Sequence, residues 1–416
     1  MMKNLKPNVC VIGGGAAGFF GALQLAEKIK SKANIVLLEK SKEPLGKVKI
    51  SGGGRCNVTH NLFDIEELIK KYPRGSKELK YAFQKFQPKD TITWFQKRNV
   101  ALKAEEDGRM FPTTDSSSTI INCFLSETQK QEINLLLGTG VRSIFLNPDS
   151  KEERFVLSID NDTEIKCACI LIATGSSKKV WNWLTSLGHT IEPPVPSLFT
   201  FSIPNSRYSN LPGISVPKAE VRLLPKGKPQ SGPLLITHWG FSGPAILKLS
   251  AFEAKNLAES DYKAKIGINW IGDFQTNELF SYFTNLRKDN PSKLIGSISL
   301  HPFPSRLFQM FLSNANIPLD KRLAETSNDE LSQLSKEITA GEFDMDGKST
   351  FKDEFVTCGG VKRKEINFEK MESKIIPGMF FAGEVIDIDG ITGGFNFQNA
   401  WTTSTIASIG IDKYLT

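Results

Sequence analysis

Two glycine-rich segments at opposite ends of the chain constrain its fold more than any other feature. Near the N-terminus, the apolar run Val9–Ile12 enters Gly13-Gly14-Gly15-Ala16-Ala17-Gly18 and continues into the apolar stretch Phe19–Ile29. Near the C-terminus, Gly383-Glu384 is followed by the glycine-rich stretch Asp389–Ala400. We therefore expect one α/β domain built from both ends of the chain, with other structure inserted between them.

The N-terminal segment has the pattern of a strand, a tight turn and a helix that bind a dinucleotide. Gly13 permits the turn, Gly15 lets the backbone approach the pyrophosphate, and Gly18 lets the helix pack on the strand. Ala16 and Ala17 begin the helix, whose free N–H groups and dipole favour phosphates.

A second predicted strand, Asn34–Leu38, ends in Glu39 and is followed by Lys40. A carboxylate about 20 residues after the glycine turn suits the ribose hydroxyls of the nucleotide. An acid at this position disfavours a 2′-phosphate, so NADP is not expected in this site. We place Glu39 and Lys40 among the cofactor-binding residues.

Three further segments bear on whether the dinucleotide is FAD or NAD. The apolar run Ile170–Ile172 ends in Ala173-Thr174-Gly175 and resembles the return strand of FAD enzymes with two dinucleotide folds. The others are the C-terminal block and Gly46-Lys47, which precedes Ser51-Gly52-Gly53-Gly54-Arg55-Cys56-Asn57. No second complete glycine fingerprint followed by a helix is present. We therefore expect no dedicated NAD domain. If NADH or NADPH is the reductant, it would visit the flavin transiently.

The cluster Ser51–Asn57 is too rich in glycine for a simple turn, because glycines let a backbone approach a ligand closely. Arg55 would face a phosphate or a substrate carboxylate. Cys56 is the one thiol in this suspected ligand loop, with either a chemical role or a packing role. The alternative for the whole cluster is a flexible surface loop.

Motifs along almost the whole chain resemble those of the BaiN/YhiN-like flavoproteins, a bacterial family also called aminoacetone-oxidase-like. The shared elements are Gly13–Gly18, Leu38-Glu39-Lys40, Ser51–Asn57, Gly108-Arg109-Met110-Phe111-Pro112, Thr237–Pro244, Cys358-Gly359-Gly360-Val361, Met371–Lys374 and Gly383–Ala400. The resemblance implies noncovalent FAD in a Rossmann-like domain of the glutathione-reductase type, interrupted by a β-rich and helical insert. It does not identify the substrate.

We divide the chain into a first part of the FAD domain (residues 1–195), an insert (196–346) and a second part (347–416). Pro193–Pro196 is the expected boundary, since clustered prolines stiffen a connection. Within the insert the patterns predict strands and then helices. The strands are Phe199–Ile203, Ala219–Leu224, Leu234–Thr237 and Lys265–Ile271, the helices are Asn277–Arg287, Ser305–Asn314 and Asp329–Ile338, and Glu354–Thr357 is the predicted return strand.

The C-terminal glycines are expected at the start of a helix that faces the flavin. N–H groups of Gly393, Gly394, Phe395 and Asn396 would stabilise negative charge at the N1/O2 edge of reduced flavin. Asp389 would bind the ribityl chain. The alternative for Asn396 is local capping of a turn.

The predicted cofactor contacts form one set taken from both ends of the chain. They are Gly13, Gly15, Ala16, Ala17, Gly18, Glu39, Lys40, Lys47, Ser51, Gly52, Gly53, Arg55, Cys56, Asn57, Ala173, Thr174, Gly175, Gly383, Glu384, Asp389, Gly393, Gly394, Phe395, Asn396 and Ala400.

Two residues are candidates for contact with substrate. His238, in the Thr237–Pro244 loop of the insert, would point into the substrate cavity, or else be a hydrogen-bonded interface histidine. Arg109 would bind an anionic group. Six cysteines without a Cys-x-x-Cys pair and four histidines without ligand spacing indicate neither a redox disulfide nor a metal site.

Composition and the N-terminus indicate a soluble, cytoplasmic protein. Hydrophobic residues make up 40% and charged residues 23% of the chain, which is ordinary for a globular protein. No apolar run approaches the roughly 20 residues that span a bilayer, and Met1–Pro7 lacks a signal-peptide core.

The net charge of +7 is concentrated between Lys70 and Lys103. Ten basic residues there are opposed by Glu78 and Asp90: Lys70, Lys71, Arg74, Lys77, Lys80, Lys85, Lys89, Lys97, Arg98 and Lys103. Interleaved aromatic residues predict helices with an apolar inner face and a basic outer face. That outer face is either a solvated surface or a docking surface for nucleic acid, anionic lipid or an acidic partner.

These patterns favour an FAD-dependent oxidoreductase acting on a small molecule, by reduction of an activated C=C bond or oxidation of an amine or ketone. A flavoprotein that binds or modifies RNA, such as a tRNA, through the basic 70–103 segment is the main alternative. A flavin-binding scaffold without turnover is a third.

Overall fold

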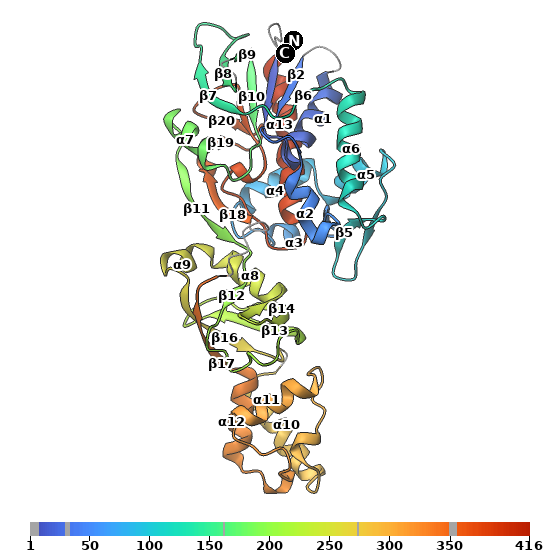
Figure 1. Cartoon of the computed structure of the whole chain (residues 1–416), viewed down its shortest axis with the longest axis vertical. Helices are drawn as coiled ribbons and strands as arrows, with labels where there is room; N and C mark the ends of the chain where they lie inside the picture. The colour runs from blue at the N-terminus through green and yellow to red at the C-terminus, as the bar shows by residue number, and fades with distance from the viewer. Residues whose placement is uncertain (1–7, 30–33, 161–162, 273, 349–355) are drawn as a thin grey trace. The chain divides into compact units, whose positions relative to one another are not determined.

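The computed structural model describes residues 8–29, 34–160, 163–272, 274–348 and 356–416. The chain divides into two compact units (Figure 1). The first, here called the two-ended unit, combines Met1–Val195 with Val356–Thr416, and the second, the inserted unit, is Pro196–Phe355. Among the described residues, no helix is both long and apolar enough to cross a membrane.

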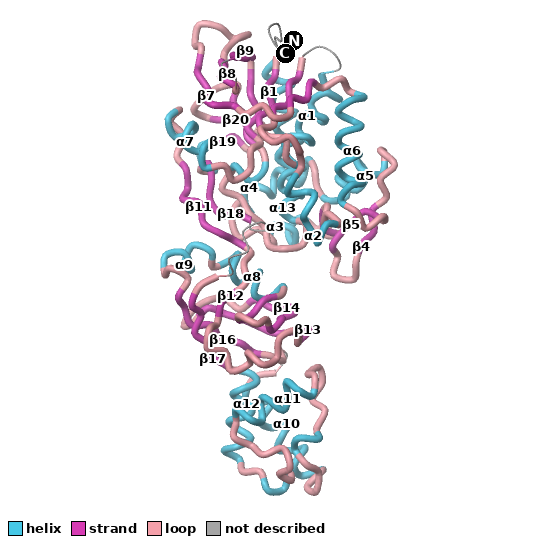
Figure 2. Tube along the Cα trace, in the orientation of Figure 1, coloured by secondary structure: helices cyan, strands magenta, loops and turns pink. Residues whose placement is uncertain are grey.

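A seven-stranded sheet forms the centre of the two-ended unit, in the order β19-β20-β21-β10-β1-β2-β6. Figure 2 draws the strands in magenta and labels β1, β19 and β20 of this sheet. The strands are β1 (Val9–Ile12), β2 (Ile35–Leu38), β6 (Asn134–Leu136), β10 (Cys169–Ile172), β19 (Ile366–Asn367), β20 (Glu372–Ser373) and β21 (Met379–Phe381). The five strands from β21 to β6 are parallel, and β19 and β20 are antiparallel additions. The predicted strands near residues 9, 35 and 170 are confirmed.

Every residue of β1, β2 and β10 is buried, as expected for parallel strands covered on both faces. Two helices from opposite ends of the chain pack together beside this sheet: α1 (Ala16–Ile29) and α13 (Phe395–Leu415). The hydroxyl of Ser404 on α13 donates to the carbonyl of Ala17 on α1 at 2.7 Å. Both ends of the chain therefore build one α/β unit.

Across its described residues, the two-ended unit also contains six α-helices and three small sheets. The helices are α2 (Gly46–Gly54), α3 (Ile65–Ile69), α4 (Ser76–Lys85), α5 (Pro88–Gln96), α6 (Ser117–Lys130) and α7 (Lys178–Ser186). The small sheets are β3 (Thr59–His60), β5 (Arg109–Pro112) and β4 (Leu102–Ala104); β7 (Val141–Leu146), β8 (Phe155–Ile159) and β9 (Thr163–Cys167); and β11 (Ile191–Ser197) with β18 (Val356–Val361). Part of the predicted return strand, residues 354–355, lies outside the described residues.

Helices α4 and α5 form most of the basic segment between residues 70 and 103. Their inner face buries Phe83, Trp94 and Phe95, so the predicted apolar face is confirmed. Trp94 packs against Phe20 of α1, with ring centroids 4.7 Å apart. The basic stretch is therefore packed onto the helix that follows the N-terminal glycine turn.

The inserted unit begins with a six-stranded antiparallel sheet in the order β12-β15-β14-β13-β16-β17. Its strands are β12 (Phe201–Ser202), β13 (Ser215–Leu223), β14 (Gln230–Ile236), β15 (Gly240–Ser242), β16 (Lys263–Asn269) and β17 (Gly341–Asp346), and its helices are α8 (Pro244–Phe252), α9 (Ala254–Glu259), α10 (Thr276–Asp289), α11 (Ser305–Asn314) and α12 (Asn328–Thr339). The three predicted helices match α10, α11 and α12. Helices α8 and α9 were not predicted.

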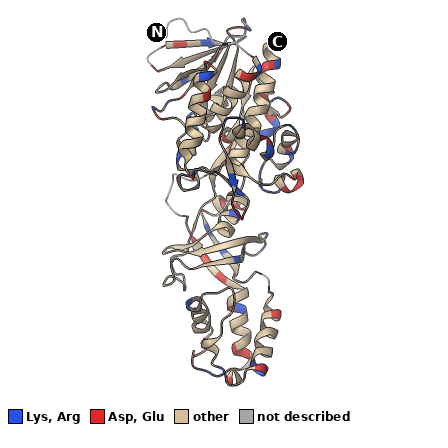
Figure 3. Cartoon of the chain, turned by 90° about the vertical axis from the view of Figure 1, so that its right-hand side faces the viewer, with Lys and Arg blue, Asp and Glu red and all other residues tan. Residues whose placement is uncertain are grey.

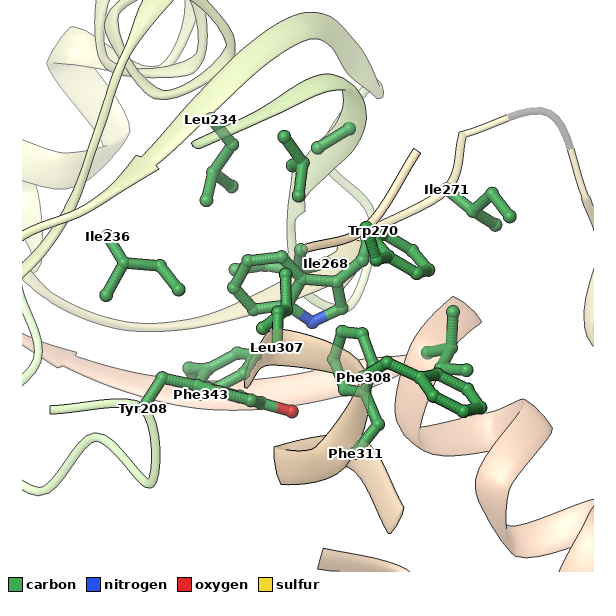
Figure 4. Close-up of a cluster of buried hydrophobic side chains, with 14 of the residues drawn as sticks. Tyr208, Leu234, Ile236, Ile268, Trp270, Ile271, Leu307, Phe308, Phe311 and Phe343 are labelled. Atoms are coloured by element: carbon green, nitrogen blue, oxygen red, sulfur yellow. The ribbon is translucent and has the colours of Figure 1, made fainter. Parts of the chain in front are cut away.

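One aromatic core joins the sheet and the helices of the inserted unit (Figure 4). Trp270 follows β16, and its ring centroid lies 5.0 Å from that of Tyr208 and 5.8 Å from that of Phe311 on α11. Phe343 on β17 lies 5.0 Å from Phe241 on β15. These side chains are almost fully buried, so the helical part depends on the sheet for its stability.

Phe311→Ala should lower the free energy of unfolding by about 3–5 kcal/mol, because it leaves a cavity where α11 meets Trp270. Urea denaturation followed by circular dichroism measures the change. Leu319→Ala is the matched control, because Leu319 is 45% exposed and exposed substitutions usually matter little. Equal effects of the two substitutions would contradict a shared core.

Candidate functional site

The turn between β1 and α1 is shaped by three glycines with different surroundings. Gly13 has φ +110°, and a Cβ added there would lie 2.5 Å from the carbonyl oxygen of Ala173. A Cβ at Gly18 would lie 1.8 Å from the carbonyl oxygen of Gly13. A Cβ at Gly15 would meet no atom within 4 Å. The protein itself therefore requires glycine at Gly13 and Gly18, whereas Gly15 leaves open space for a ligand.

Glu39 lies beside this turn, directly after β2. Its Oε2 accepts a hydrogen bond from Gly14 N at 2.6 Å, and its Oε1 accepts one from Ser41 N at 2.7 Å. Both bonds orient the carboxylate at the carboxyl end of the parallel strands, where ligands bind in open α/β sheets. Lys40 is exposed next to it.

The ends of β10 and β21 bring two more predicted segments to the same edge. Ala382 N donates to Ile172 O at 3.0 Å. Gly175 has φ +61°, and a Cβ added there would lie 3.5 Å from Glu384 Oε2. Within the described residues, Thr174 Oγ1 is buried and has no hydrogen-bond partner. A buried hydroxyl without a partner is unusual in a folded protein and fits a site that a ligand completes.

Lys47 and Glu384, predicted from distant parts of the sequence, form an ion pair. Lys47 lies on α2, and Glu384 lies in the short 3-10 turn Gly383–Val385. The second carboxylate oxygen of Glu384 accepts from Thr357 N at 2.9 Å. This pair joins α2 to the C-terminal block.

The glycine cluster after Lys47 is partly helical rather than a loop throughout. Helix α2 extends to Gly54, but Ser51, Gly52 and Gly53 leave helical geometry. Gly53 and Gly54 have positive φ, and a Cβ at either would meet nothing within 4 Å. The end of α2 is therefore a glycine turn with an open outer side, as a ligand-binding turn requires.

Asn57 joins this turn to the start of α13. In the amide orientation that satisfies both groups, its nitrogen donates to Thr59 O and its oxygen accepts from Gly394 N, each at 3.0 Å. A Cβ at Gly394 would lie 2.5 Å from Thr59 O. The structure thus brings together two predicted segments that are far apart in the sequence.

Cys56 is fully buried. Burial raises the pKa of its thiol to about 12, opposed only in part by a hydrogen bond with Ser51. The thiol is therefore neutral at physiological pH and shielded from ligands. Of the two alternatives for Cys56, the structure supports packing, and its side chain is not a cofactor contact.

Asp389 corrects an expectation, because it does not present its carboxylate to a ribityl chain. It is fully buried, and its two oxygens accept from Arg74 in a bidentate ion pair, with Arg74 Nε 2.6 Å from Oδ1. Arg74 is likewise buried and is one of the ten basic residues counted in the 70–103 segment. The pair joins that segment to the C-terminal block and is structural.

The other C-terminal residues support the turn before α13. Asn396 accepts from Gly390 N and donates to Gly390 O, both at 2.8 Å, so its side chain caps the turn, the alternative to cofactor contact. Phe395 and Ala400 are buried. The side chains of these residues are therefore engaged within the protein, and their contact with a cofactor stays a prediction.

Arg55 and Arg109 are both engaged by carboxylates. Arg55 Nη1 lies 2.6 Å from Glu105 Oε1, and Arg109 Nη2 lies 2.8 Å from Glu105 Oε2. Arg109 Nε also pairs with Asp107 at 2.7 Å. An anionic ligand would have to compete with these acids, so the predicted anion contacts stay predictions.

His238 is exposed in the turn between β14 and β15. It belongs to the inserted unit, and its predicted place in a substrate cavity stays a prediction. His60 on β3 was not singled out, because a lone histidine carries no motif. Its Nδ1 lies 2.9 Å from the carbonyl oxygen of Gly393, and burial lowers its pKa.

A protein-family profile described as "HI0933-like protein Rossmann domain" matches residues 7–410. The chain is 28% identical to a ribosomal RNA dihydrouridine synthase of Haemophilus influenzae, over 99% of this chain and 100% of that protein. It is 27% identical to the Escherichia coli protein of the same name, over 95% of each. A 3-dehydro-bile acid delta(4,6)-reductase of Clostridium scindens is 24% identical, over 95% of this chain and 97% of that protein.

Solved structures share the fold. A 3-ketosteroid-delta4-(5alpha)-dehydrogenase from Rhodococcus jostii superposes with a TM-score of 0.52 at 11% identity, over 98% of each chain. The open conformation of a flavocytochrome c3 fumarate reductase gives a TM-score of 0.51 at 16% identity, over 98% of this chain and 78% of that chain. At these identities the likeness concerns the fold alone.

Gly15→Val should abolish binding of FAD while leaving the protein folded, because a Cβ there would meet no atom of the described residues within 4 Å. Absorbance of the purified protein and release of the nucleotide on denaturation measure the cofactor. Gly18→Ala is the contrasting variant, since its Cβ meets the Gly13 carbonyl and should destabilise the fold itself by about 1–3 kcal/mol. A Gly15→Val protein with full FAD content would show that the pyrophosphate lies elsewhere.

Asp389→Ala should lower the free energy of unfolding by about 3–5 kcal/mol, because it leaves the Arg74 guanidinium buried without its carboxylate. Urea denaturation measures this. The control Glu66→Ala removes the exposed ion pair with Lys80, and such pairs contribute little. If Asp389→Ala lost FAD but kept its free energy of unfolding, the original expectation that Asp389 binds the ribityl chain would be supported.

Proposed function

The chain belongs to the HI0933-like Rossmann family of FAD-dependent oxidoreductases, and we propose that it reduces a carbon–carbon double bond conjugated with a carbonyl group. FAD is its cofactor, and in its reduced form it supplies a hydride. We assign the pyrophosphate to the turn at Gly15, the adenosine ribose to Glu39, and the flavin to the turn before α13.

The reaction class is supported by what the names of the relatives have in common. Two relatives are named for making dihydrouridine, which is uridine with a saturated C5–C6 bond. The third is named a delta(4,6)-reductase. Each product forms when one hydride and one proton add across a conjugated double bond, so that one π bond is lost and two C–H bonds form. NADH or NADPH is the proposed source of the electrons.

We propose uracil within ribosomal RNA as the substrate. The observation that carries this choice is the match, at 28% and 27% identity over nearly the whole of each chain, to two proteins named for that substrate. The third relative is less similar, at 24%. The positive net charge of +7 also suits a polyanionic substrate.

The basic segment supports RNA less strongly than its composition suggests, because many of its basic residues have acidic partners. Figure 3 draws Lys and Arg in blue and Asp and Glu in red, and the two colours are interspersed along the chain. Arg74 is buried against Asp389, and Arg98 pairs with Glu27 and Glu127. Lys70, Lys80 and Lys103 also have acidic partners. In the described part of the chain, the exposed lysines left for phosphate contacts on α4, α5 and the turn after α5 are Lys77, Lys85, Lys89 and Lys97.

A small dienone is the second candidate substrate, favoured by the bile-acid reductase that aligns over 95% of this chain. The same hydride and proton transfer would apply.

The test uses purified protein reduced with dithionite under argon, so that it does not depend on the electron donor. Mixed with ribosomal RNA transcribed in vitro, the reduced protein should convert uridine to dihydrouridine, detected by mass spectrometry of digested nucleosides. A steroid dienone with delta(4,6) double bonds is tested in parallel by loss of its absorbance. If the dienone is reduced but no dihydrouridine forms, the substrate is a small molecule and not RNA. If neither substrate is reduced, the proposed reaction class is wrong.

Two variants sharpen this experiment. Gly15→Val, which lacks FAD, should give no product from either substrate. The double charge reversal Lys85→Glu and Lys89→Glu should keep FAD and weaken RNA binding, with a shallower dependence on salt. Unchanged RNA affinity in the double variant would remove α4 and α5 from the RNA contact.

A further inference from the structure

Three side chains between residues 57 and 72 bind three consecutive residues at the start of α13. Asn57 accepts from Gly394 N at 3.0 Å, and Tyr72 Oη donates to Phe395 O at 2.8 Å. His60 Nδ1 lies 2.9 Å from Gly393 O. The imidazole ring also stacks on Phe395, with centroids 4.6 Å apart.

The turn needs such support because of its glycines. Gly393 has φ +126° and Gly394 has φ +89°, and glycine pairs leave a backbone unusually free to change conformation. A two-glycine turn without side-chain contacts would not fix the direction of its N–H groups. The three bonds from Asn57, His60 and Tyr72 remove that freedom.

The chemistry of the contact assigns a tautomer to His60. A carbonyl oxygen only accepts hydrogen bonds, so Nδ1 must carry the proton. Burial lowers the pKa of His60, and its bond to Gly393 opposes the shift. Among the charged groups that face the ring, Asp107 raises the pKa, whereas Lys71 and Arg109 lower it. Near pH 8 the ring is therefore neutral, with Nδ1 as donor.

We propose that His60 is a positioning residue for the flavin. By donating from Nδ1 to the Gly393 carbonyl, it holds the turn so that N–H groups at the start of α13 face negative charge on reduced FAD. The Gly394 N–H is not one of them, because it donates to Asn57. Such preorganised donors stabilise developing charge. The inference rests on the proposed placement of the flavin at this turn. His60 is not among the cofactor contacts predicted from the sequence.

The test compares variants that separate the donor from the ring. His60→Asn keeps an N–H donor near the position of Nδ1, and His60→Phe keeps a stacking ring without a donor. His60→Gln places its amide nearer the position of Nε2 and serves if His60→Phe does not fold. The readouts are FAD affinity and the two-electron midpoint potential at pH 8, measured by dye equilibration without substrate.

We expect His60→Phe and His60→Gln to disfavour reduction about tenfold, which is about 30 mV lower for a two-electron couple. His60→Asn should stay close to the wild-type potential. An unchanged potential in His60→Phe, or an equal fall in His60→Asn, would overturn the role of the Nδ1 donor.

The outcome is separable from that of the proposed function, because no substrate enters the measurement. If the protein makes dihydrouridine but the His60 variants have unchanged midpoint potentials, only the role of His60 is wrong. If the potentials shift but neither RNA nor the dienone is reduced, only the proposed reaction is wrong.

Discussion

Packing of α13 against α1 is the contact on which the rest of the structure depends. Ser404 donates to Ala17 O, and Gly21 brings α1 close enough to α13 that a Cβ there would lie 3.5 Å from the Cβ of Ser404. Trp401 of α13 packs on Phe20 of α1, with centroids 5.0 Å apart. This contact brings the two ends of the chain together in one unit.

Polar groups buried along α13 determine how that helix is rotated and where it begins. Gln398 accepts from Thr59 at 2.6 Å and from Thr91 at 2.9 Å, and Thr402 donates to Phe86 O at 3.0 Å. Because an unsatisfied buried polar group costs about 1–3 kcal/mol, a shifted helix would lose several such bonds. These partners lie within residues 57–91. The same segment contains Asn57, His60 and Tyr72, which bind the glycine turn before α13. One segment of the chain therefore both fixes the position of α13 and holds the glycine turn at its start.

Several charged residues predicted to face a ligand or an RNA backbone pair with acids of the protein itself. Arg74 and Asp389 form a buried pair between residues 315 positions apart, and Arg55 and Arg109 share Glu105. A count of basic residues in the 70–103 segment thus overstates the surface available to an RNA backbone. The remaining exposed lysines on α4 and α5 are the part of that segment that an electrostatic contact with RNA would use.

The sequence by itself determined the local parts: β1, β2 and β10, the glycine turn, Glu39, and helices α10 to α12. These follow from apolar runs, periodicity and the backbone freedom of glycine, which act within a few residues. Only the tertiary structure decided that Asp389 pairs with Arg74, that Cys56 is buried, and that His60 binds a carbonyl 333 positions away. A side chain's partner depends on which distant segments pack beside it, and no local pattern encodes that. The glycines could therefore be assigned from the sequence, whereas the residues that hold them in place could not.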